Sequence, residues 1–190
     1  MTKTLAILLL ILALTPALYS KNLKPEDYPT KNIIEIDNVR VTILKFEIGT
    51  YKYSSHRNAM EMESEKEFFI LYVQIENLSQ TRIVDVGYVW NNSKLIDEYK
   101  NVYDVKSNFS HYDKVQGHTT KERLNPGEKI NNIILFEKPL NISNTFHFSC
   151  DPNFTYKTVD GSVEVSAKKI YFKFFRKDIG KEFSVSGTEK

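Results

Sequence analysis

The chain has 190 residues with 26 basic and 24 acidic side chains, so its formal net charge is only +2. This near-balance argues against a general nucleic-acid binder, which needs a strong positive field to displace counterions from phosphates. Hydrophobic residues make up 41% and aromatic residues 13% of the sequence. That composition is typical of a folded chain rather than a disordered one.

The N-terminus has the three parts of a secretory signal peptide. Lys3 supplies a positive charge, residues 5–14 form an uninterrupted apolar run, and a proline between small residues ends it. A transmembrane helix needs roughly 20 apolar residues, so this run is short for a permanent span. We therefore predict a signal peptide over residues 1–20, cleaved near Ala17 or Ser20, and export to an extracytoplasmic space (secreted or periplasmic). The alternative is an uncleaved anchor through residues 5–14, which alone would give the protein a membrane contact.

The first part of the mature chain changes from a linker to β-strands. Residues 21–32 carry two prolines and mixed charge, which predicts a linker. After them, apolar and polar residues alternate with the period of two that indicates strands. The alternation shifts by one residue at Ile43-Leu44, as a β-bulge would require. The clearest strand is 68–77, in which every second residue contributes to one fully apolar face.

Turn signals divide the rest of the chain. Val84 to Trp90 alternate and predict another strand, and Asn125-Pro126-Gly127-Glu128 predicts a type II turn. Asp160-Gly161 predicts a two-residue hairpin loop. No stretch of the mature chain keeps a helical period over twelve residues. Seven or more short strands predict an all-β, antiparallel β-sandwich over residues 33–178, followed by a polar tail over 179–190.

Two segments carry a family resemblance. The strand 69–77 (FILYVQIEN) ends in an asparagine, and the turn and strand 124–136 (LNPGEKINNIILF) end in a phenylalanine with Pro139 close behind. Together they resemble a bacterial family of exported immunoglobulin-like domains of unknown function, many of whose members are lipoproteins. The resemblance covers roughly residues 36–150. It implies an immunoglobulin-like sandwich and an extracytoplasmic location, and it transfers no catalytic residues. This chain lacks the lipidated cysteine of the lipoprotein members.

The densest charge feature is an acidic run. Glu61, Glu63, Glu65 and Glu67 are spaced by two, so in an extended strand their carboxylates would share one face and suit Ca²⁺. Calcium sites usually lie on a turning loop that contains glycine, and this run has none. The other interpretation is a solvated strand entry whose charges discourage pairing between sheet edges.

Histidine and cysteine offer a second set of candidates. His111 and His118 lie with Asp113 in a loop-like stretch, where they could assemble a metal or acid–base site in space, although surface histidines are the simpler interpretation. Cys150 is the single cysteine, which excludes a disulfide framework. It shares a strand face with Phe146 and Phe148, so we predict a buried hydrophobe rather than a nucleophile.

These observations favour an exported, non-enzymatic, immunoglobulin-like binding module. We expect no cofactor, and a partner that is an unknown protein or envelope component. The polar stretches 54–67 and 108–120 are the first places to look for its binding surface, since sandwiches carry function on loops. The basic and aromatic run 168–177 is first of all a core strand. Two alternatives stay open: an envelope-associated structural domain held by an uncleaved N-terminus, and a weak hydrolase or metal site around His111, Asp113 and His118.

Overall fold

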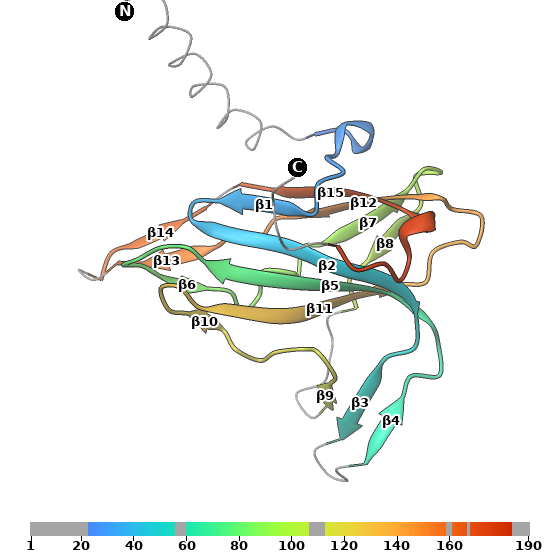
Figure 1. Ribbon diagram of the computed structural model, residues 1–190, viewed down its shortest axis with the longest axis horizontal. Helices are drawn as coiled ribbons and strands as arrows, with labels where there is room; N and C mark the ends of the chain where they lie inside the picture. The colour runs from blue at the N-terminus through green and yellow to red at the C-terminus, as the bar shows by residue number, and fades with distance from the viewer. Residues whose placement is uncertain (1–22, 56–59, 107–112, 159–160, 167, 184–190) are drawn as a thin grey trace, which may run out of the picture.

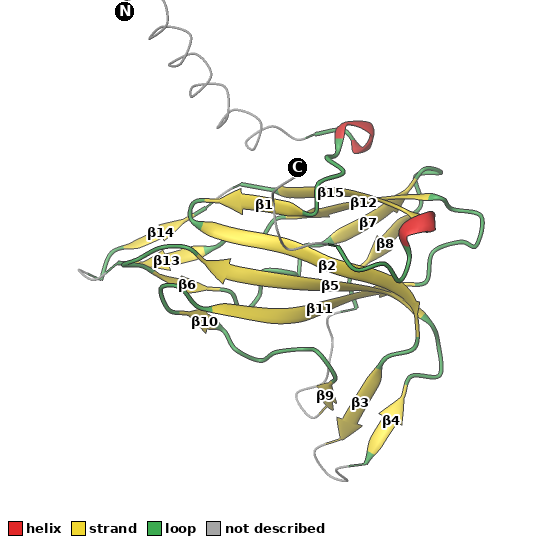
Figure 2. Cartoon of the chain, in the orientation of Figure 1, coloured by secondary structure: helices red, strands yellow, loops and turns green. Residues whose placement is uncertain are grey.

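The computed structural model describes residues 23–55, 60–106, 113–158, 161–166 and 168–183. In these residues antiparallel strands are joined by turns, and the helical segments are two 3₁₀ turns, η1 (Pro25–Asp27) and η2 (Arg176–Asp178) (Figures 1 and 2). The predicted all-β fold class is confirmed.

Two four-stranded sheets form the sandwich. The first has the order β1 (Ile33–Ile36), β2 (Val39–Gly49), β5 (Phe68–Asn77) and β11 (Lys129–Glu137). The second has the order β15 (Ile170–Phe175), β12 (Thr145–Cys150), β7 (Lys94–Asp97) and β8 (Val102–Asp104). By their place in the sheets, β2, β5 and β11 correspond to strands A, B and E of immunoglobulin domains, with β1 added at the edge. In the second sheet, β15, β12, β7 and β8 correspond to strands G, F, C and C′. An isolated bridge between Val105 and Phe136 links the two sheets at one side.

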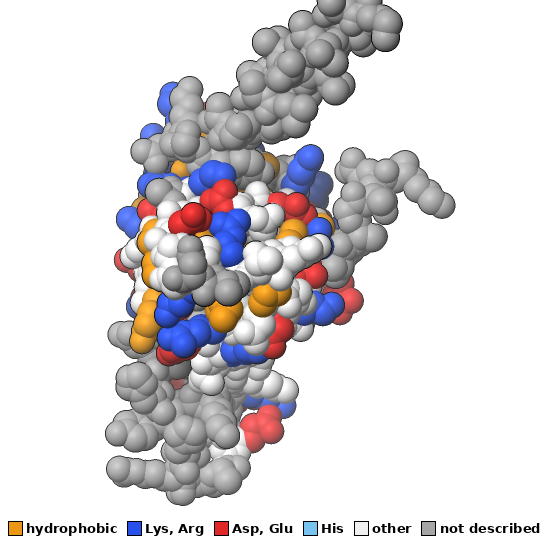
Figure 3. Space-filling view, turned by 90° about the vertical axis from the view of Figure 1, so that its left-hand side faces the viewer, with side chains coloured by type: hydrophobic (Ala, Val, Ile, Leu, Met, Phe, Trp, Pro, Cys, Tyr) orange, Lys and Arg blue, Asp and Glu red, His pale blue; other side chains and the backbone are white. Residues whose placement is uncertain are grey.

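Two smaller sheets extend the sandwich. One, with the order β10 (Arg123–Leu124), β6 (Ile83–Asp85), β13 (Thr155–Lys157) and β14 (Val163–Val165), lies at one end of the molecule. Seen from that end, basic, acidic and apolar side chains are intermixed (Figure 3). The other, β4 (Glu61–Glu63), β3 (Lys52–Ser55) and β9 (Asp113–Val115), projects from the opposite end of the sandwich.

The core lies between the two large sheets and is rich in phenylalanine. Alternate residues of β5 point inward, so Phe69, Leu71, Val73 and Ile75 are fully buried. Phe69 lies 5.4 Å from the ring of Phe46 and 5.3 Å from the ring of Phe146, which joins three strands of both sheets. Burial of such rings is the main stabilising contribution in a sandwich without disulfides.

Several local predictions are confirmed. The register of β2 against β5 shifts between Ile43 and Lys45, which is the predicted bulge. Gly127 has a φ of 73°, and the Glu128 N–H donates to the Asn125 carbonyl at 3.0 Å, as a type II turn requires. The buried Asn77 side chain donates to the carbonyls of Arg82 and Leu124. Asn77, the last residue of the predicted strand 69–77, therefore holds the Pro-Gly turn in place.

The ends of the domain pack on the sandwich. Tyr28, in the predicted linker, is 7% exposed and contacts His147 and Tyr171 on the outer face of the second sheet. The Lys173 N–H donates to the Pro29 carbonyl at 2.8 Å. At the other terminus, the Phe183 N–H donates to a carbonyl of β2. Residues 23–32 and 179–183 thus belong to the packed domain.

Candidate functional site

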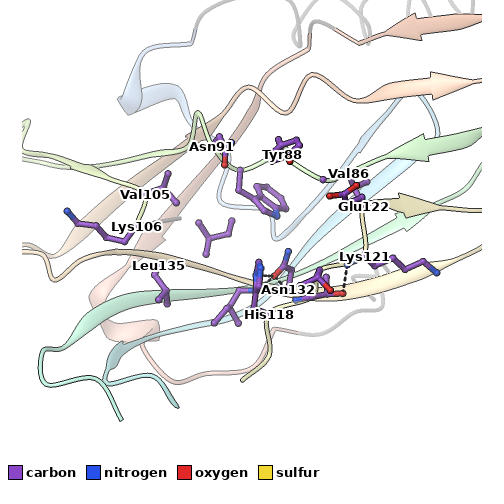
Figure 4. A pocket seen from close by; sticks show the side chains of 16 residues that line it. Val86, Tyr88, Asn91, Val105, Lys106, His118, Lys121, Glu122, Asn132 and Leu135 are labelled. Carbon is purple, nitrogen blue, oxygen red and sulfur yellow. Dashed lines mark hydrogen bonds between the residues drawn. The ribbon is translucent and has the colours of Figure 1, made fainter. Parts of the chain in front are cut away.

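A pocket of about 400 Å³ opens beside the sandwich where four segments of the chain meet (Figure 4). One wall is the turn after β6, a second is the chain between β9 and β10, the third is the middle of β11, and the residues just after β8 complete the lining. The lining residues are Val86, Gly87, Tyr88, Trp90, Asn91, Val105, Lys106, His118, Thr119, Thr120, Lys121, Glu122, Asn132, Ile133, Ile134 and Leu135.

The first wall departs from the sequence prediction. We predicted a strand through Trp90, but β6 ends at Asp85 and residues 87–92 form turns. The Asp85 carboxylate accepts a hydrogen bond from the Gly87 N–H at 3.1 Å, and this local turn competes with continued strand pairing. As a result Tyr88 is 75% exposed, whereas Trp90 is 8% exposed.

The turn is fixed from both sides. The Val86 N–H donates to the Glu122 carbonyl at 2.7 Å, which ties the first wall to the second. A side chain at Gly87 would place its Cβ 3.2 Å from the Glu122 Cγ, so the absence of a side chain allows this close approach. On the core side, the Cys150 thiol donates to the Val89 carbonyl at 2.9 Å. Cys150 is 2% exposed, which confirms the prediction that it is buried. Burial raises the pKa of its thiol to about 12.

The second wall begins at a tight turn. Gly117 has a φ of 84°, and the His118 N–H donates to the Val115 carbonyl at 3.0 Å. A Cβ at Gly117 would approach the Ile133 side chain to 3.1 Å, so both the backbone conformation and the space favour glycine. This turn directs His118 against the third wall.

His118 is held by an amide. Its Nδ1 lies 2.8 Å from the Asn132 Oδ1, which also accepts the Ile133 N–H at 2.8 Å. Because that oxygen can only accept, we assign the proton of the neutral imidazole to Nδ1. Burial lowers the pKa of His118 and outweighs the opposing effect of the Asn132 hydrogen bond. The lowered pKa favours the neutral imidazole.

The two lysines that line the pocket both form ion pairs with glutamates. Lys106 forms an ion pair with Glu137 at 2.5 Å, and Lys121 forms one with Glu128 at 2.7 Å. With a neutral His118, the pocket has no excess of positive charge that would attract a phosphate or a carboxylate. Its remaining polar groups are amides, hydroxyls and the Glu122 carboxylate.

An aromatic side chain forms the back of the pocket. The Trp90 ring lies 6.5 Å from the ring of Phe148 in the core, and Trp90 also lines the pocket. The buried Trp90 Nε1 has no hydrogen-bond partner among the described residues. Since Trp90 is the single tryptophan of the chain, its fluorescence reports directly on this region.

The acidic run does not come together. Glu61 and Glu63 lie on β4, where Glu61 pairs with Lys52 at 3.1 Å and Glu63 accepts a hydrogen bond from Thr50. Glu67 lies beyond a bend, pairs with Lys138 at 2.5 Å, and is separated from β4 by the exposed Glu65. Across the described part of the chain, no group of three or more histidine, cysteine or acidic side chains is arranged to hold a metal ion.

Only part of the predicted site around His111, Asp113 and His118 lies within the described residues. His118 lines the pocket, while His111 lies outside the described residues and only the backbone of Asp113 is described. Of the two loops that we singled out, 108–120 contributes His118, Thr119 and Thr120 at its end, and the described residues of 54–67 do not line this pocket. The predicted signal peptide and its cleavage sites also lie outside the described residues. Within the described ranges, no helix is long and apolar enough to cross a membrane.

Comparisons with known proteins add a fold-level likeness. No protein-family model matches the chain, and no curated protein matches it. The crystal structure of the YjhA protein from Bacillus subtilis is similar with a TM-score of 0.45 and 11% identity, over 73% of this chain and 97% of that chain. The resemblance to the exported bacterial domain family stays a prediction.

Proposed function

We propose that this protein is an exported, non-enzymatic binding module whose ligand occupies the pocket beside Trp90. The observation that carries the proposal is the pocket itself. Its volume of about 400 Å³ lies in the range of roughly 300–1,000 Å³ typical of small-molecule sites. An apolar back wall faces several polar groups that converge from separate segments, which is the usual composition of such sites.

The arrangement suits binding better than catalysis. The pocket offers amides, hydroxyls and aromatic faces, and its histidine is neutral with Nδ1 bound to Asn132. General acid–base work needs a base within hydrogen-bond reach of the reacting group and usually a partner that orients it. Asn132 orients the imidazole, but the described residues that line the pocket include no serine or cysteine nucleophile for it to activate.

The single tryptophan provides the test. The purified protein is titrated with three panels, namely neutral oligosaccharides, short peptides and sugar phosphates, while Trp90 emission is recorded. We expect at least one panel to give a saturable change in emission. Thr120→Tyr, at an exposed position that lines the pocket, should abolish that change by filling the space.

A matched variant controls for indirect effects. Thr81 is also an exposed threonine but does not line the pocket. Thr81→Tyr should bind as the unmodified protein does. If Thr120→Tyr binds as tightly as Thr81→Tyr, or if no panel changes the emission, the pocket is not the binding site and the proposal fails.

A further inference from the structure

A second hollow lies on the other side of the Tyr88 turn. It has a volume of about 470 Å³ and is formed by the turn and by the chain between β12 and β13. The lining residues are Asp85, Gly87, Tyr88, Val89, Asn91, Asn92, Pro152, Asn153 and Thr155. Gly87, Tyr88 and Asn91 line both hollows. Tyr88 therefore stands on a ridge between two binding-sized depressions.

The ridge presents an aromatic ring on a rigid base. Tyr88 is 75% exposed, yet the next two residues, Val89 and Trp90, are 3% and 8% exposed. The Asn91 N–H donates to the Tyr88 carbonyl at 3.2 Å, and Cys150 holds the Val89 carbonyl. The exposed ring on a fixed turn offers a flat face for stacking, with a hydroxyl at its edge.

The polar groups around the ridge act as both donors and acceptors. Asn91 and Asn132 belong to the first hollow, and Asn91, Asn92 and Asn153 to the second. The Asn132 oxygen is taken by His118 and the Ile133 N–H, so this residue can offer its amide N–H groups. The carboxamides of Asn91 and Asn92 can both donate and accept, which matches neighbouring hydroxyl groups on a ring. Thr120 and Thr155 add one hydroxyl to each hollow.

The charges disfavour an anionic ligand. Lys106 and Lys121 form ion pairs with carboxylates, as described above. Glu122 adds a carboxylate to the first hollow, and Asp85, which lies 4.0 Å from Arg123, adds one to the second. A phosphate or carboxylate ligand would therefore meet no field of opposite sign in either hollow.

From these observations we propose that the ligand is a neutral oligosaccharide that runs across Tyr88 and places sugar rings in both hollows. The apolar C–H face of one ring stacks on Tyr88, and hydroxyl groups bind the asparagine amides on either side. The proposal rests on the function proposed above and specifies its ligand class. A peptide paired with β11, which lines the first hollow and is the edge strand of its sheet, is the alternative occupant that the panels distinguish from an oligosaccharide.

Chain length and stacking are tested together. Cello-, chito-, manno- and xylo-oligosaccharides of increasing length are titrated against the protein with Trp90 emission as readout. For at least one series we expect affinity to rise about tenfold or more from the disaccharide to the hexasaccharide. Tyr88→Ala should weaken hexasaccharide binding about tenfold, and Tyr88→Phe, which keeps the ring, should bind within about threefold of the unmodified protein.

Two control variants separate the parts of the claim. Tyr99→Ala removes a 54% exposed tyrosine that lines neither hollow, so binding should not change. Thr155→Tyr fills the second hollow, so it should remove the advantage of longer chains over the disaccharide.

The two proposals fail in different ways. If peptides or sugar phosphates give the saturable response that Thr120→Tyr abolishes, and no oligosaccharide does, the ligand class is wrong and the binding module stands. Oligosaccharide binding that ignores length, or that survives Tyr88→Ala, also overturns the present proposal. If no panel binds, both proposals fall.

Discussion

His147 illustrates at the residue scale how packing decides the behaviour of a titratable group. It projects from the outer face of β12 but is 6% exposed, because Tyr28 lies over it with ring centroids 5.7 Å apart. Its Nδ1 is buried without a partner among the described residues. Burial lowers the pKa of His147, and the nearby charge of Lys173 lowers it further. A hydrogen bond with the backbone of Ile96 and the charges of Glu98 and Glu26 raise it, but their effect is smaller.

This lowered pKa predicts a loss of stability on acidification. The folded state favours the neutral imidazole, so the unfolded state takes up protons first as the pH falls below the ordinary pKa of 6.5. We expect the melting temperature to fall between about pH 7.5 and pH 5.5, and His147→Gln to reduce that fall. Carboxylates with lowered pKa, such as Asp97, keep their contribution in this range because they protonate at lower pH.

Thermal unfolding followed by circular dichroism at the two pH values provides the measurement. His118, whose pKa is also lowered, leaves a residual pH dependence in the His147→Gln protein. An identical fall in melting temperature with and without His147 would contradict the interpretation.

At the scale of elements, Asp97 joins the β7–β8 hairpin to the loop that leads into β12. Its buried carboxylate accepts hydrogen bonds from the Asn101 N–H at 2.9 Å, the Tyr103 hydroxyl at 2.9 Å and the Ser143 hydroxyl at 2.8 Å. Burial alone would raise the pKa of Asp97, but these bonds, first among them those of Asn101, hold it below its usual value. One carboxylate thus fixes two loops that are far apart in the sequence.

Removing this carboxylate should cost more than a surface substitution. Asp97→Ala leaves several buried donors unsatisfied, so we expect a loss of about 3 kcal/mol in the free energy of unfolding. Asp97→Asn, which keeps some of the acceptors, should lose less. Urea unfolding measures both, and Asp104→Ala on the exposed side of β8 serves as the control. Equal stability of Asp97→Ala and Asp104→Ala would contradict this account.

The elements also show what sequence patterns can predict. The strand 68–77, the bulge after Ile43 and the Pro-Gly turn were predictable, because alternation and turn chemistry are local properties. The strand expected through Trp90 was wrong, because a single hydrogen bond from Gly87 to Asp85 turns the chain where apolar alternation still continues. An aspartate two residues before a glycine was the available signal.

At the scale of the whole molecule, the sandwich could be predicted and its candidate site could not. The pocket draws on residues 86–91, 105–106, 118–122 and 132–135, and neither period nor spacing indicates that these segments meet. Of the candidates chosen from the sequence, His118 lines it, together with Thr119 and Thr120 at the end of the stretch 108–120. Glycines 87 and 117 mark close approaches in the folded protein, and only a structure shows what they approach.

Export stays a prediction from the N-terminal sequence, and it can be tested on the protein made in its own cells. We expect the protein in the extracytoplasmic fraction of its cells to begin between residues 18 and 21, because signal peptidase cuts after small residues that follow the apolar run. N-terminal sequencing of that fraction provides the measurement. A chain that retains residues 5–14 and sediments with membranes would favour the anchored alternative.

The most direct test of the binding site is chemical-shift mapping of the ¹⁵N-labelled protein during titration with the oligosaccharide series. The account predicts that the backbone amides that shift cluster at residues 86–92, 118–122 and 132–135, with Trp90 Nε1–H among them. Shifts confined to the opposite loops at 98–101 and 138–144, or no shifts at concentrations that saturate the Trp90 emission, would contradict it.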